Sequence, residues 1–124
     1  MALECEELAG KIIGAAIEVH RQLGPGYIES IYENALVYEL RKRRLKVEQQ
    51  LEAPVLYDGN VEVGKHRLDL LVEGEIVVDL KAISELQDIH FAIVKSQLRA
   101  MKRKHGLLLN FTKVRLEAKR VIAE

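Results

Sequence analysis

The fold of this chain is decided by residues 67–81, which read RLDLLVEGEIVVDLK. Two mainly apolar runs flank a central Glu-Gly-Glu, a pattern that indicates two strands joined by a tight turn. Side chains alternate along a strand, so Asp79 and Lys81 share one face of the second strand. The first strand carries Asp69 on one face, and its other face is apolar: Leu68, Leu70 and Val72. If both apolar faces join one core, Asp69 lies on the same side of the sheet as Asp79 and Lys81.

The length of the turn between these strands decides whether the two aspartates meet. A two-residue turn after Val72 would move Asp69 to the wrong face, because a shift of one residue exchanges the two faces of a strand. We therefore predict a three-residue loop at residues 73–75, with Gly74 or its neighbour in a left-handed conformation, or a bulge of equivalent effect. Such a loop places Asp69 beside Asp79.

These side chains suit a metal site. Two carboxylates on adjoining strands offer the hard oxygen ligands that Mg²⁺ or Mn²⁺ prefers, and the backbone carbonyl of Leu80 could add a further ligand. Lys81 follows Asp79 by two residues, so its ammonium could stabilise developing negative charge or orient an attacking water. The residues Asp69, Asp79 and Lys81 therefore predict a site for phosphodiester hydrolysis.

The alternative is that Asp79 and Lys81 form a simple salt bridge on a solvent-facing strand. Against this alternative, the two residues interrupt the run 76–82, which otherwise has the composition of a central strand. Burying charges in such a strand without a functional reason is costly. We therefore favour the catalytic interpretation.

The remaining sequence surrounds these strands with helices. Apolar residues at three- and four-residue spacing predict helices, whereas alternation and β-branched residues predict strands. The predicted helices cover residues 6–23, 27–44 and 88–105, and the predicted strands cover residues 46–57, 61–72, 75–82 and 107–111. Gly24 and Gly106 are the expected stop signals of two helices. Residues 116–122 fit either an extended or a helical segment, although Val121 and Ile122 favour a strand.

The predicted order is α-α-β-β-β-α-β-β. Three strands joined by short turns indicate an antiparallel portion, whereas the strand–helix–strand that follows indicates a parallel pair. We expect an α/β fold with a mixed β-sheet flanked by helices. The length of 124 residues is close to the usual size of one domain, so we expect a single domain over residues 1–124.

The charge balance argues against a protein that coats nucleic acid by bulk electrostatics. The chain has 19 basic and 19 acidic residues, so its formal net charge is zero. Basic residues cluster at 41–44 and 102–105, where two predicted helices end. Cations at a helix C-terminus complement the helix dipole, which we favour over a phosphate-binding patch for both clusters.

A cytoplasmic location is expected from three features. The single cysteine, Cys5, cannot form an internal disulfide, and the first residues do not have the pattern of a secretory signal. No segment approaches the ~18 uninterrupted apolar residues of a membrane-spanning helix, so we expect no membrane partner.

The spacing of the charged residues also resembles a known superfamily. Asp69, followed ten residues later by Asp79-x-Lys81 in this order of elements, is similar to the motif of the PD-(D/E)XK nucleases. The resemblance implies a restriction-endonuclease-like fold and a metal-dependent nuclease that binds Mg²⁺ or Mn²⁺. One departure is that Asp79 stands where many members carry glutamate, which would shift the metal slightly.

A second motif makes the resemblance more specific. Gly26, Glu29 and Tyr32 are spaced as in the motif that gives the bacterial and archaeal GxxExxY protein family its name. Residues 13–21 and 106–111 are also similar to that family, so the resemblance covers nearly the whole chain.

The resemblance implies further site residues, and each has a structural alternative. An acidic residue from the helix before the sheet often joins the metal, and Glu29 is the matching candidate; alternatively, it stabilises the helix N-terminus by its charge. Tyr32 is expected to pack, with its hydroxyl holding a neighbour. His20 is a possible supporting residue, although a single histidine near a helix end is more often structural.

The third predicted helix supplies another supporting candidate. Gln97 corresponds to the polar residue that often lies beside the site in the superfamily, but Met101 occupies the position where a Gln-x-x-x-Tyr pattern has tyrosine. The participation of Gln97 is therefore an open question. His90, Lys95 and Arg99 on this helix could face phosphate, although His90 could equally cap the start of the helix.

The leading functional hypothesis is a nuclease acting on DNA more than on RNA. Specific protein–DNA interfaces bury about 1,000 Å² or more of protein, so a domain of this size predicts a homodimer or a partner protein. Two alternatives stay open: a non-catalytic nucleic-acid-binding domain that keeps the fold, and a protein-interaction module.

Overall fold

The computed structural model describes the backbone of residues 2–123 and the side chains of residues 5–123. The elements are α1 (Ala2–Leu23), α2 (Glu29–Lys42), β1 (Val47–Tyr57), β2 (Val61–Val72), β3 (Ile76–Lys81), α3 (Asp88–Met101), β4 (His105–Asn110) and β5 (Glu117–Ile122). The predicted order is confirmed, and the last segment is a strand. Within residues 2–123, no helix combines the length and the apolar character that crossing a membrane requires.

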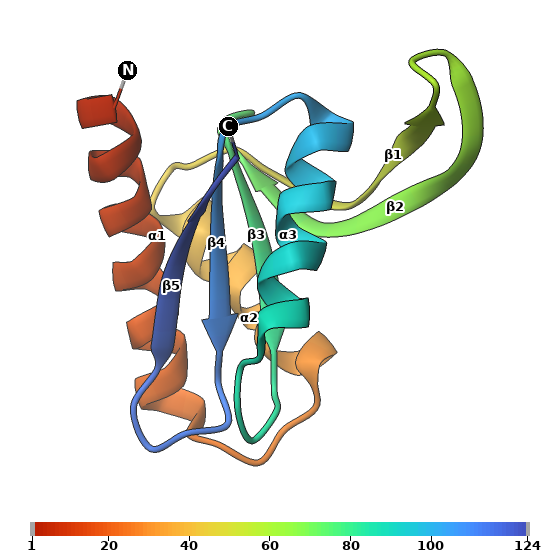
Figure 1. Ribbon diagram of the computed structural model, residues 1–124. Helices are drawn as coiled ribbons and strands as arrows, with labels where there is room; N and C mark the ends of the chain where they lie inside the picture. Colours follow the sequence, from red (N-terminus) through yellow and green to blue (C-terminus); the bar gives the residue numbers. More distant parts are fainter. Residues whose placement is uncertain (1, 124) are drawn as a thin grey trace.

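The five strands form one mixed sheet in the order β1-β2-β3-β4-β5. Neighbouring strands are antiparallel except β3 and β4, which are parallel and connected through α3. Helices α1 and α2 lie against one face of the sheet, and α3 lies against the other (Figure 1). The predicted α/β fold with a mixed sheet between helical layers is therefore confirmed.

Each face of the sheet has its own apolar core. Leu70 and Val78 pack in the core on the side of α1 and α2, which includes Leu36. Val77 packs in the core on the side of α3, which includes Val94. Because both faces of β3 are buried, its sequence is apolar at nearly every position before Asp79.

The turn between β2 and β3 has the predicted length. Val72 pairs with Ile76, so the loop consists of residues 73–75. Glu73 and Gly74 both have left-handed backbone conformations, with φ of 53° and 65°. The prediction of an odd loop with a left-handed residue at or beside Gly74 is therefore confirmed.

One predicted face assignment is wrong. Leu68 was expected to share a face with Leu70, but Leu68 packs in the core beside α3, whereas Leu70 packs on the opposite side. The change of face coincides with Gln50, which lies between the β1 residues that pair with Leu68 and Leu70 and has a left-handed φ of 56°. We call the part of the β1–β2 hairpin beyond this point, residues 51–68, the arm. The arm bends away from the rest of the sheet (Figure 1).

The predicted end of the third helix is also wrong. Helix α3 ends at Met101, where the next residue, Lys102, has a left-handed φ of 56° and caps the helix. Gly106 is not a stop signal; it lies in β4, where an added Cβ would be 3.0 Å from Val94 Cγ1. Gly106 therefore allows α3 to pack closely on the sheet.

Candidate metal-binding site

Asp69 lies where the backbone pairing between β2 and β3 ends. The last paired residues at this end are Leu70 and Val78. The next residue, Asp69, uses its side chain instead: its Oδ2 accepts a hydrogen bond from the backbone N–H of Leu80 at 2.9 Å. This hydrogen bond fixes the first carboxylate against β3.

Asp79 and Lys81 form an ion pair that is largely removed from solvent. The Lys81 Nζ lies 3.2 Å from Asp79 Oδ2 and 3.4 Å from Oδ1, and the two side chains are only 19% and 7% exposed. The pair therefore differs from the solvent-facing salt bridge considered as the alternative. The contact with Oδ2 does not have hydrogen-bond geometry, and Asp79 Oδ2 has no hydrogen-bond partner among the described residues.

Asp79 lies close enough to Asp69 to raise the pKa of Asp69. Burial is the largest cause that raises the pKa of Asp69, and the interaction with Asp79 raises it further, to about 7. The hydrogen bond from Leu80 and the charge of Lys81 lower this pKa, but they do not offset the other two effects. A second positive charge beside the pair would favour the ionised form of Asp69.

These residues fit a small divalent cation. Mg²⁺ is often held by only one or two carboxylates and keeps its remaining positions for water and phosphate. Asp69 and Asp79 supply the two carboxylates, and Asp79 Oδ2, which has no hydrogen-bond partner among the described residues, is available as a ligand atom. The N–H and C=O of one strand residue point toward the same neighbouring strand, so the Leu80 carbonyl is on the side of Asp69.

Glu29 does not join the two aspartates in this structure. It is exposed in the first turn of α2, where its charge complements the helix dipole. Among the residues that the structure describes, no group of three His, Cys, Asp or Glu side chains could hold a metal ion. The expected fourth member of the site is therefore absent from the arrangement.

A polar network that the sequence analysis did not find lies one turn further along α2. Glu33 is buried, and both of its carboxylate oxygens accept hydrogen bonds from Gln50 Nε2, at 2.9 and 2.8 Å. Gln49 Nε2 donates a third bond to Glu33, at 2.7 Å. The network ties α2 to β1 at Gln50, where the sheet faces change. The only signal in the sequence was a second acidic residue four positions after Glu29.

Tyr32 and His20 have structural contacts. The Tyr32 ring stacks on Phe111 at 4.5 Å, and its hydroxyl donates to the Gly24 carbonyl at 2.6 Å. The prediction that Tyr32 packs and holds a neighbour with its hydroxyl is confirmed. His20 Nε2 donates to the Lys113 carbonyl at 2.8 Å, which connects α1 to the loop after β4.

Gln97 and His90 have different positions on α3. Gln97 is buried, its Nε2 is 3.5 Å from the Arg67 carbonyl, and its Oε1 has no hydrogen-bond partner among the described residues. Gln97 therefore contacts β2 two residues before Asp69. His90 Nδ1 accepts a hydrogen bond from the Gln87 N–H and caps the start of α3, as one of the two expectations for it stated.

Comparisons with known proteins agree with the observed fold. Residues 6–121 match the family model of the PD-(D/E)XK nuclease superfamily. A solved structure described as "Crystal structure of SSO0001" is similar, with a TM-score of 0.61 and 19% sequence identity, over 77% of this chain and 50% of that chain. The matched part therefore spans half the length of that relative. No curated protein matches the chain. The expected restriction-endonuclease-like fold is confirmed.

Proposed function

Because this chain belongs to the PD-(D/E)XK nuclease superfamily, we propose that it is a metal-dependent nuclease that hydrolyses phosphodiester bonds, in DNA in preference to RNA. The observation that carries the proposal is the meeting of Asp69 and Asp79 beside Lys81, where β2 and β3 separate. Two carboxylates held together away from solvent repel each other unless a cation or a proton lies between them. Such an arrangement destabilises the folded protein, so the needs of folding alone do not explain it.

Each residue has a distinct role in the proposed reaction. Asp69, Asp79 and the Leu80 carbonyl would hold Mg²⁺ or Mn²⁺, which when bound supplies a Lewis acid for the phosphate and a more acidic water. Asp69 would hold the metal in its ionised form, because a ligand carboxylate must be ionised. Lys81 is held against Asp79, and its ammonium stabilises the negative charge that develops on the phosphate. Glu29 is left out of the proposed site because it is exposed and apart from the pair.

The finer family placement is also part of the proposal. Gly26, Glu29 and Tyr32 support membership of the GxxExxY family. Two of these residues have a role in the fold. Gly26 has a φ of 114°, which favours glycine, and Tyr32 anchors the loop before α2 through Gly24.

A cleavage assay with matched variants tests the proposed function. Purified protein is incubated with Mn²⁺ or Mg²⁺ and with labelled single-stranded, duplex and branched DNA. We expect cleavage by the wild-type protein and a loss of about 100-fold or more in Asp79→Asn and in Lys81→Gln, because each removes a charge that acts in the transition state. Glu62→Gln is the control, because Glu62 is exposed on the arm.

Two results would contradict the proposal. The first is the absence of cleavage of every substrate by a folded wild-type protein with metal. The second is cleavage that persists unchanged in both site variants. Binding of DNA without cleavage would instead support a non-catalytic nucleic-acid-binding domain. Gel filtration and light scattering with and without DNA test the further proposal of a homodimer, which follows from the small contact surface of one domain.

A further inference from the structure

The charges of this chain are segregated, although they balance overall. Residues 89–116 contain seven of the 19 basic residues and none of the 19 acidic residues. Lys95 and Arg99 are four residues apart on α3, so they lie on one side of the helix, and Lys102 caps its C-terminal end. All three side chains are exposed. None of them forms an ion pair among the residues that the structure describes. The layer that covers the face of Asp79 and Lys81 is therefore strongly positive on its outer side.

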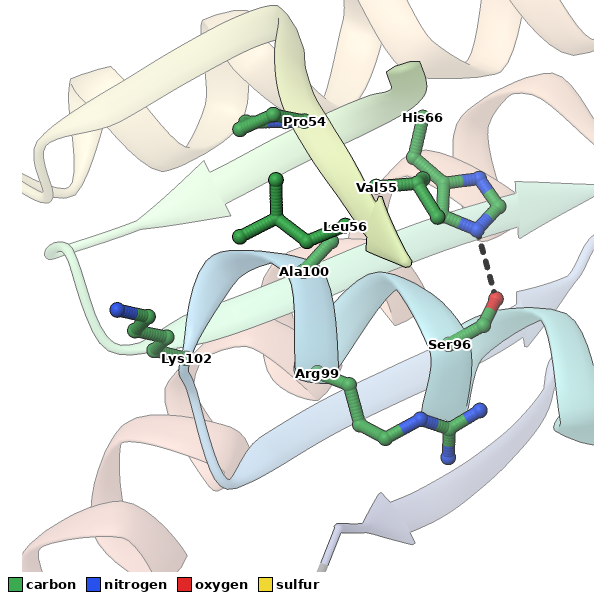
Figure 2. Close-up of a pocket in the computed structure, with 8 residues that line it drawn as sticks. All are labelled: Pro54, Val55, Leu56, His66, Ser96, Arg99, Ala100 and Lys102. Carbon is green, nitrogen blue, oxygen red and sulfur yellow. Dashed lines mark hydrogen bonds between the residues drawn. The ribbon is translucent and has the colours of Figure 1, made fainter. Parts of the chain in front are cut away.

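A cavity of about 270 Å³ lies between the arm and α3, beside these cations (Figure 2). Arg99 and Lys102 line it from α3, and His66 lines it from β2, whereas Pro54 and Leu56 of β1 provide an apolar wall. No acidic side chain lines the cavity. Arg99 also lines two neighbouring hollows of the surface, so the positive region continues beyond the cavity.

His66 and Ser96 in this cavity are not a nucleophile and its base. Ser96 Oγ donates its single proton to the Ile93 carbonyl at 2.6 Å. His66 Nε2, at 2.8 Å from Ser96 Oγ, must therefore be the donor in that contact. A serine whose proton is already donated elsewhere cannot pass it to this histidine. The pair instead connects the arm to α3 (Figure 2), and the cavity is a place for binding.

We propose that this cavity and its rim bind the backbone of duplex DNA, with Arg99 and Lys102 each neutralising one phosphate. The proposal rests on the proposed nuclease function and specifies the form of its substrate. Unpaired cations that face no acidic group attract phosphate irrespective of base sequence. No Phe, Tyr or Trp side chain lines the cavity, whereas sites for single strands combine cations with such large aromatic rings, on which bases stack. The cavity therefore favours a duplex.

The position of the cavity on β2 sets its distance from the cleavage site. His66 precedes Asp69 by three residues, which span about 10 Å of extended strand. Each strand of a DNA duplex carries one phosphate per about 3.4 Å of helix axis. The cavity is thus close enough to Asp69 and Asp79 for one duplex to contact both.

The test measures binding in EDTA, so that cleavage plays no part. Fluorescence anisotropy follows a labelled 20-base-pair DNA duplex at increasing KCl concentration. For Arg99→Gln combined with Lys102→Gln, we expect the slope of log K against log salt to become shallower by about 1.8, because each lost cation contributes about 0.9. The matched control combines Lys11→Gln with Arg44→Gln, which removes two exposed cations from the side of α1 and α2. We expect little change in its slope.

The outcomes separate this proposal from the proposed function. Equal slope changes in the two double variants would overturn the cavity as a specific site, and so would tighter binding of the single strand or of an RNA duplex than of duplex DNA. If duplex binding depends on Arg99 and Lys102 but no substrate is cleaved, the cavity stands and the nuclease assignment fails. If cleavage depends on Asp79 but the slopes of the two double variants are equal, the nuclease assignment stands and the cavity proposal fails.

Discussion

The carboxylate of Asp69 takes the place of a backbone partner for Leu80. Its Oδ2 accepts the Leu80 N–H at 2.9 Å at the point where the pairing of β2 with β3 has stopped. This bond holds Asp69 beside Asp79, and it needs only an oxygen acceptor, not a negative charge. An asparagine can therefore keep the bond while removing the repulsion between the two aspartates.

Asp69→Asn separates the charge of this side chain from its hydrogen bond. The folded-state pKa of Asp69 is raised to about 7, so the folded protein holds a proton that the unfolded chain releases at lower pH. The contribution of Asp69 to stability is therefore complete below its unfolded pKa, and it is lost as the pH rises through about 7. We expect Asp69→Asn to equal the wild-type protein at pH 4 and to exceed it in free energy of unfolding at pH 8.

Urea denaturation in EDTA at a series of pH values measures this difference. Glu62→Gln is the control, because Glu62 is exposed and should give a difference that does not change with pH. If Asp69→Asn differs from the wild-type protein by the same free energy of unfolding at pH 4 and at pH 8, the pKa of Asp69 is not raised in the folded protein.

Divalent metal should stabilise the folded protein through both aspartates. Binding to the folded state alone adds about 2.7 kcal/mol at a metal concentration 100 times the Kd. We expect Mn²⁺ to raise the Tm at pH 8, and to raise it less at pH 6, where a proton on Asp69 competes with the metal. Thermal unfolding with and without Mn²⁺ measures the shift. Asp79→Asn should abolish it, and an undiminished shift in that variant would place the metal elsewhere.

Tyr32→Phe tests the anchor of the loop before α2. The Tyr32 hydroxyl donates to the Gly24 carbonyl at 2.6 Å and accepts the Tyr27 N–H at 3.2 Å. Its removal leaves both groups without this partner, so we expect a loss of about 1–2 kcal/mol in the free energy of unfolding. Tyr38→Phe is the matched control, because Tyr38 is 68% exposed. Equal losses in the two variants would mean that the buried Tyr32 hydroxyl contributes no more to the free energy of unfolding than the exposed hydroxyl of Tyr38.

Two glycines should respond to alanine in opposite directions. Gly74 has a φ of 65°, which strains any other residue, so Gly74→Ala should lower the free energy of unfolding by about 1 kcal/mol or more. Gly10 lies in α1 and is exposed, and an added Cβ would meet no neighbour within 4 Å, so Gly10→Ala should raise the free energy of unfolding by about 0.5–1 kcal/mol. Chemical denaturation of both variants gives the comparison. Stabilisation by Gly74→Ala would contradict the left-handed turn.

The local features of this protein follow from its sequence. The loop at residues 73–75 is predictable because the side-chain period of a strand is two, and only an odd loop brings Asp69 and Asp79 to one face. The same local periodicities predict the order of helices and strands, and they place Lys81 beside Asp79. Each of these inferences needs only neighbours within a few residues.

Other features depend on contacts between distant parts of the chain, and only the tertiary structure decided them. The left-handed backbone of Gln50 has no local signal, and its partner Glu33 is 17 residues away. Gln50 marks the change of face that puts Leu68 against α3. Gly106 resembles a helix stop in the sequence, but its lack of a side chain serves the packing of α3. The periodicity of a segment predicts which of its residues share a face. The features named above depend instead on contacts between segments that are distant in the sequence.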